Sequence, residues 1–234
     1  MTSSLKGISS RHFRFSVFVF VLAALLNDAI RSHAAIIGYR FEGTVGLISP
    51  TGVTPFGVQA TTGAPATPVT GHFYYDLDST GNVNGLSSEY QQSIANGFSA
   101  TINGHVISAD SYFVSVADRT GTAFDTFSVV YSSFTGPPPT SPLTVDDTPH
   151  TTGRFSVTFN GSSSVFSNKL LPTTLNSASF SIKNGMLTES SSAPGIFFNI
   201  TTLVAIPEPS GIVLCSGGTF LLFGFKRRRR LHLR

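Results

Sequence analysis

Alternation of apolar and polar residues runs through the middle of the chain. Phe73 and Tyr75 alternate with His72 and Tyr74, and the same period of two recurs over residues 155–159 and 179–182. A period of two sends one set of side chains into a core and the other into solvent, as in a half-buried β-strand. Further strands are predicted at residues 36–48, 112–117, 123–131 and 196–204.

Two Asn-Gly pairs add tight turns to these strands. Asn103-Gly104 and Asn184-Gly185 each stand between short apolar runs, and both residue types tolerate the positive φ that a type I′ hairpin requires. Residues 91–95 are predicted to form a single helical turn. About nine short strands without an amphipathic helix predict an all-β fold, with a β-sandwich or jelly roll as the architecture.

The two ends of the chain follow a different pattern. Lys6, Arg11 and Arg14 precede an apolar run over residues 15–26, and small residues follow at positions 32 and 34. This order is typical of a secretory signal peptide, so residues 1–34 are predicted to be removed by cleavage after Ala34. The alternative is an uncleaved N-terminal anchor, which the shortness of the run disfavours.

The C-terminus carries a second apolar run, residues 211–225, followed by a basic cluster. As a helix this run rises about 22 Å, against a hydrocarbon core of about 30 Å, so a short membrane crossing is predicted. Clustered cations favour the cytoplasmic side, which places residue 207 outside. The stop cluster consists of Lys226, Arg227, Arg228, Arg229 and Arg230.

Pro207-Glu208-Pro209-Ser210, the apolar run and the basic cluster together resemble the PEP-CTERM sorting signal of bacterial exported proteins. The resemblance covers residues 207–230 only. It implies that a membrane-embedded exosortase reads Pro207, Glu208 and Pro209 and removes the tail. The chain would cross the bacterial inner membrane, remain transiently in it as a single-pass protein with a cytoplasmic C-terminus, and then reach the cell surface or the extracellular matrix. The alternative is a permanent C-terminal anchor, with Pro-Glu-Pro as its linker.

Without these ends, residues 35–206 form one passenger domain of changed composition. This domain contains five basic and ten acidic residues, a formal charge of −5, whereas the whole chain has +3. The overall basicity belongs to the membrane signals, which argues against nucleic acid as a partner. The only cysteine, Cys215, lies in the apolar tail, so the passenger domain holds no disulfide and no thiol nucleophile.

The passenger domain offers one candidate for metal chemistry. Asp76, Asp78, Thr80 and Asn82 alternate as in the first half of a calcium loop, with a glycine at the sixth position. The twelfth position is Ser87 rather than glutamate. A polar turn closed by aspartate hydrogen bonds explains the same residues without an ion.

Local signatures of catalysis are absent from the sequence. The three histidines of the passenger domain have no metal-binding spacing, and no Gly-x-Ser-x-Gly elbow occurs. The predicted function is therefore a non-enzymatic surface or matrix protein without a cofactor. A polysaccharide-binding module is one alternative, and a secreted hydrolase assembled from distant residues is another. For the module, the candidate sugar-stacking rings are Tyr74, Tyr90, Tyr112 and Tyr131, although burial in the core is the commoner role for such rings.

Overall fold

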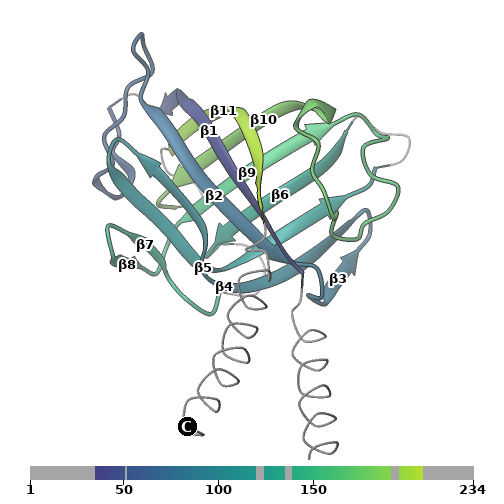
Figure 1. Cartoon of the computed structure of the whole chain (residues 1–234). Coiled ribbons are helices and arrows are strands. Elements are labelled where there is room, and N and C mark those ends of the chain that lie inside the picture. Colours follow the sequence, from purple (N-terminus) through teal and green to yellow (C-terminus); the bar gives the residue numbers. More distant parts are fainter. Residues whose placement is uncertain (1–34, 51, 120–123, 135–138, 191–194, 208–234) are drawn as a thin grey trace, which may run out of the picture. The chain divides into compact units, whose positions relative to one another are not determined.

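The computed structural model describes residues 35–50, 52–119, 124–134, 139–190 and 195–207 (Figure 1). These residues fold into strands joined by loops and two short 3₁₀ turns, η1 (Pro55–Gly57) and η2 (Ser177–Ser179). The strands are β1 (Ile36–Ser49), β2 (Pro68–Asp76), β3 (Gly81–Asn84), β4 (Ser87–Ile102), β5 (His105–Ala117), β6 (Asp125–Ser132), β7 (Leu143–Val145), β8 (Thr148–His150), β9 (Arg154–Gly161), β10 (Phe180–Thr188) and β11 (Gly195–Ile206).

Eight of these strands close into one antiparallel barrel. Around the ring the order is β1, β2, β4, β5, β6, β9, β10 and β11, and β11 pairs with β1 again. The long β4 makes the closure, because residues 98–102 pair with β2 on one edge and with β5 on the other. The short strand β3 and the β7–β8 hairpin extend the sheet at opposite ends of the β4–β5 pair (Figure 1).

The prediction of an all-β fold is confirmed, but the prediction of a sandwich architecture is wrong. Alternation with a period of two requires one buried face per strand, and a closed sheet satisfies it as well as two stacked sheets do. Closure needs strands that bend, and the ladders of β1, β4 and β10 all contain register shifts. Such irregularities bend a strand and increase its twist.

Aromatic side chains fill the interior of the barrel. Phe73 lies at the centre, where its ring stands 5.5 to 6.5 Å from those of Tyr39, Phe41, Tyr75, Phe127 and Phe159. An eight-stranded barrel has an interior just wide enough for side chains to fill. The fully buried rings therefore form a packed core that extends to Phe98, Phe155 and Phe198.

Only one of the two Asn-Gly hairpins exists. Asn103 (φ 51°) and Gly104 (φ 83°) form the turn between β4 and β5, as predicted. Asn184-Gly185 instead lies inside β10, so the prediction of a second hairpin is wrong. Gly185 serves packing there, because a Cβ at this position would stand 2.1 Å from the ring of Phe198 on the paired strand β11.

Two local predictions fail at β-bulges. Residues 91–95 belong to β4 and form no helical turn. The register of β4 against β5 shifts between Ser93 and Phe98, where Asn96 has a φ of 51°. The register of β10 shifts between Phe180 and Ile182, which leaves Phe180 buried and Ile182 exposed, although the period of two over residues 179–182 predicts that both face the core.

The loop over residues 162–176, here called the capping loop, closes one end of the barrel. Three tyrosine hydroxyls hold it from neighbouring strands. The Tyr75 and Tyr90 hydroxyls donate to the carbonyls of Pro172 (2.8 Å) and Lys169 (2.7 Å), and the Tyr39 hydroxyl accepts from the Leu175 amide (2.5 Å). The buried side chains of Leu171 and Leu175 join the core cluster.

The capped end is also where the described chain begins and finishes. Gly38 pairs with Ile206 across β1 and β11, and Pro207 follows directly, exposed to solvent. We call this the terminal end of the barrel, and the end where β1 finishes and β11 begins the distal end. Residues 35 and 207, the first and last of the described chain, therefore both lie at the terminal end.

Candidate functional site

Three of the four candidate sugar-stacking tyrosines belong to the core. Tyr90, Tyr112 and Tyr131 are buried, with exposed fractions of 5%, 0% and 2%. The Tyr112 hydroxyl donates to the carbonyl of Tyr74 at 2.8 Å. Burial raises the pKa of the Tyr112 phenol far above its ordinary value, so it stays neutral. Burial in the core therefore accounts for these three rings, and Tyr74 alone among the four candidates is half-exposed.

Tyr74 lines a shallow hollow of about 270 Å³ on the outer face of β1, β2 and β4. Its ring covers Gly38 on the paired strand, where an added Cβ would stand 2.5 Å from the ring edge. The ring of His72 lies edge-on, 5.4 Å from that of Tyr74. The imidazole Nε2 of His72 is 2.9 Å from the carbonyl oxygen of Asn96, and Arg40 lies opposite His72 on β1. We call this surface the Tyr74 hollow.

The composition of the Tyr74 hollow suits a neutral or weakly charged polar ligand. The ring offers an apolar face, while Thr70, Thr101 and the Arg40 guanidinium line the rest of the hollow. Aromatic faces bordered by hydrogen-bonding groups are typical of sites for amphipathic rings such as sugars. The titratable or charged groups in the lining are the His72 imidazole, the Arg40 guanidinium and the Tyr74 phenol.

The predicted calcium loop is a hydrogen-bonded turn. Asp76 ends β2, and its Oδ1 accepts from the backbone amide of Asp78 at 2.9 Å, which is the geometry of an Asx turn. The amide of Asp76 donates to the Gln92 side chain, while Asp78, Thr80 and Asn82 point to solvent. Among the described residues no group of three or more His, Cys, Asp or Glu side chains is placed to hold a metal. The hydrogen bond from the Asp78 amide to Asp76 supports the polar-turn alternative for this segment.

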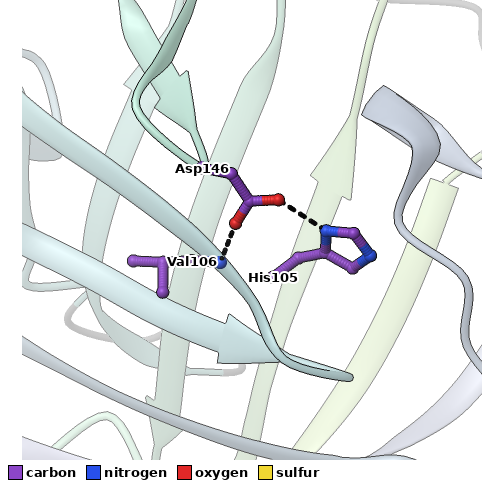
Figure 2. Close-up of polar contacts among 3 residues, drawn as sticks. All are labelled: His105, Val106 and Asp146. Atoms are coloured by element: carbon purple, nitrogen blue, oxygen red, sulfur yellow. Dashed lines mark hydrogen bonds and ion pairs between the residues drawn. The ribbon is translucent and has the colours of Figure 1, made fainter.

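A carboxylate–imidazole pair marks the distal end (Figure 2). Asp146 stands in the turn between β7 and β8, and its Oδ2 lies 2.7 Å from Nδ1 of His105 on β5. The other carboxylate oxygen accepts from the amide of Val106 at 2.8 Å. These contacts hold the pKa of Asp146 below its ordinary value, with the His105 hydrogen bond as the largest cause. The pair therefore joins the β7–β8 hairpin to the barrel.

This pair predicts a pH-dependent stability. A carboxylate with a lowered pKa contributes stability above its ordinary pKa of 3.8, and that contribution is lost as the pH falls further. Asp146→Asn is expected to lower the melting temperature near neutral pH and to have little effect well below pH 3.8. Asp147→Asn is the matched control, because both positions have a positive φ that asparagine tolerates. Equal losses in both variants, or a loss that persists in acid, would contradict this role.

Of the predicted sorting motif, the structure describes only the first residue, Pro207. Pro207 is exposed and follows β11 directly. Glu208, Pro209 and the basic cluster 226–230 lie outside the described residues, as do the apolar runs 15–26 and 211–225. In the part of the chain that is described, no helix has the length and apolar character needed to cross a membrane.

Comparison of the chain with protein-family models, with curated proteins and with solved structures finds no match.

Proposed function

We propose that the chain is a non-enzymatic exported protein of the bacterial surface or extracellular matrix, delivered as an exosortase substrate. The C-terminal tail would hold it in the inner membrane only until a membrane-embedded exosortase recognises Pro207, Glu208 and Pro209. The barrel would be the part that stays outside. The Pro-Glu-Pro motif, the apolar run and the basic cluster, in that order, support the sorting step.

The position of Pro207 is the observation that carries this proposal. All eight ring strands lie within residues 36–206, and the exposed Pro207 comes immediately after the last of them. Prolines bias the preceding residue toward extended backbone, which a protease or transpeptidase can bind. Removal of the tail after this point would break none of the strand pairs of the barrel. A removable tail and a self-contained passenger are what a sorting substrate requires.

A fusion tests whether the tail alone is sufficient. Residues 207–234 are attached to an unrelated exported reporter domain in the native host. The reporter is expected to lose the tail and to appear outside the membrane fraction, whereas the same fusion carrying Glu208→Ala keeps it. A reporter that remains membrane-bound with the intact motif contradicts the proposed sorting function.

The Tyr74 hollow supports a second candidate function, a polysaccharide-binding module. A half-exposed ring beside histidine, arginine and threonine side chains is suited to stack on a sugar. Under this function the passenger would attach the released protein to extracellular polymer. The hollow lies on the outer side wall of the barrel, and Ala100 is the one lining residue that also belongs to the core cluster.

Tyr74→Ala is expected to weaken binding to a neutral polysaccharide about two- to tenfold, since an aromatic contact contributes roughly 0.5–1.5 kcal/mol. Affinity electrophoresis through polysaccharide-containing gels measures the change. Phe124→Ala is the control, because Phe124 is an exposed ring, 44% accessible, that does not line the hollow. Unchanged mobility for Tyr74→Ala, or an equal change for Phe124→Ala, would exclude the Tyr74 hollow as the sugar site.

A further inference from the structure

A second hollow, here called the Arg154 hollow, lies on the outer face of the barrel over β4, β5, β6 and β9. Its volume is about 230 Å³, and it shares no lining residue with the Tyr74 hollow. This volume is below the 300–1,000 Å³ typical of sites for drug-sized ligands. The Arg154 hollow therefore suits one small ring rather than an extended molecule.

The sheet register builds the floor from two adjacent rows. Glu89, Ser115 and Ser128 are directly paired across β4, β5 and β6, so they form a polar row. Phe113 and Val130 are paired two residues further along β5 and β6, and they form an apolar row beside it. Both apolar side chains are half-buried. The floor therefore offers an apolar face and a line of hydrogen-bonding groups side by side.

Arg154 supplies the positive end of this hollow. It begins β9, pairs with Ser132 of β6, and is half-buried. Its Nε is buried and has no hydrogen-bond partner, a condition shared among the described residues only by Nε2 of Gln92. No carboxylate of the described chain forms an ion pair with Arg154, although the passenger domain as a whole is acidic.

A buried guanidinium nitrogen without a partner in such a place points to an acceptor from outside the chain. Arginine stays charged at all ordinary pH values and presents a planar fork of N–H donors that matches a carboxylate. Leaving a buried donor unsatisfied is unfavourable, and each such group calls for an explanation. A bound carboxylate would satisfy Nε and the neighbouring donors together. Glu89, exposed on β4 across the hollow, would repel that carboxylate and so direct it toward Arg154.

We propose that the Arg154 hollow binds a uronate unit of an acidic polysaccharide. The sugar carboxylate would accept from Arg154, the ring would lie on Phe113 and Val130, and the ring hydroxyls would bond to Glu89, Ser115 and Ser128. The carboxylate, the ring face and the hydroxyls of a uronate each have a matching side chain in the lining of the Arg154 hollow. This inference deepens the second candidate function, and it is independent of the sorting signal.

The test compares trigalacturonate with neutral galactotriose, using the full chain in mild detergent and isothermal titration calorimetry. The wild type is expected to bind the uronate more tightly. Arg154→Gln should weaken uronate binding about tenfold or more, as loss of a charge-assisted hydrogen bond implies, and should leave neutral-sugar binding unchanged. Both proteins carry the same basic tail, so attraction of the anion to residues 226–230 does not contribute to the difference.

Two further variants keep the test decisive. Ser128→Leu keeps Arg154 and should block the hollow by filling it, so it reports on the site even if Arg154→Gln fails to fold. Lys183→Gln removes a cation of β10 that lines neither hollow, so it should leave uronate affinity intact. An equal loss in Lys183→Gln, no loss in a folded Arg154→Gln, or equal affinity for inorganic sulfate overturns the proposal. If neither oligosaccharide binds the wild type, the proposal of a polysaccharide-binding module is itself wrong. If both bind with equal affinity, only the assignment of a uronate to the Arg154 hollow is wrong.

Discussion

Glu208→Ala is expected to leave the C-terminal tail on every molecule and to move the protein from the surface and the medium into the membrane fraction. The motif resembles the one that an exosortase reads, and the retained apolar run and basic cluster would then act as a permanent anchor. Each cation costs about 2.5–3.5 kcal/mol at the centre of a bilayer, so five consecutive cations would hold the tail in place. Immunoblots of fractionated cells measure the distribution.

Glu42→Ala provides the matched control for this variant. Glu42 is an exposed glutamate of β1, with a half-accessible side chain, and its removal should leave release unchanged. If Glu208→Ala were released to the surface and the medium as the wild type is, the proposal that an exosortase recognises this motif would be contradicted. Retention of both variants would indicate a folding or export defect instead.

Phe73→Ala is expected to cost about 3–5 kcal/mol of unfolding free energy, the usual range for truncating a fully buried phenylalanine. The ring of Phe73 has no accessible surface and contacts five other aromatic rings. Since a domain is stabilised by only about 5–15 kcal/mol, this change should remove a large share of the total. Denaturant titration monitored by tyrosine fluorescence measures it.

Phe124→Ala is the control for the core variant. Phe124 precedes β6 and is 44% accessible, so its loss should stay below about 1 kcal/mol. Similar losses at both positions would mean that the barrel interior is not the stabilising core. A change in the denaturant slope would indicate an altered unfolded or native state.

The sequence predicts strands well where one face is apolar throughout. Phe73 and Tyr75 are buried, and so are Phe155, Val157 and Phe159. Alternation reports only which face of a strand is buried, however, and does not report its neighbours. The closing pairs between β4 and both β2 and β5 join segments that no local pattern links, so a sandwich and a barrel look alike in sequence.

Turn and core predictions failed where tertiary packing outweighed local preference. Asn184-Gly185 favours a hairpin, yet both residues pair with β9 on one side and β11 on the other, and the ring of Phe198 covers Gly185. Ile182 is exposed because a bulge shifts the register after Phe180. Both outcomes depend on the partner strand.

The candidate sites were only partly predictable. Tyr74 was among the four rings proposed from the sequence, but the sequence does not distinguish it from the other three tyrosines. Those three are buried by the capping loop and by the barrel interior, which only the structure shows. Arg154 was missed entirely. An arginine at the start of a strand gives no signal by itself, and its significance comes from β4, β5 and β6, which place Glu89, serines and Phe113 around the same hollow.

Intact mass spectrometry of the protein recovered from its native host, separated into membrane, surface and medium fractions, tests the central claim most directly. We expect a species that begins near Ala35 and ends between Pro207 and Ser210, with any added mass identifying what the new C-terminus carries. If residues 211–234 remained on every molecule, the chain would be a permanently anchored β-barrel domain, and the proposed sorting function would be contradicted.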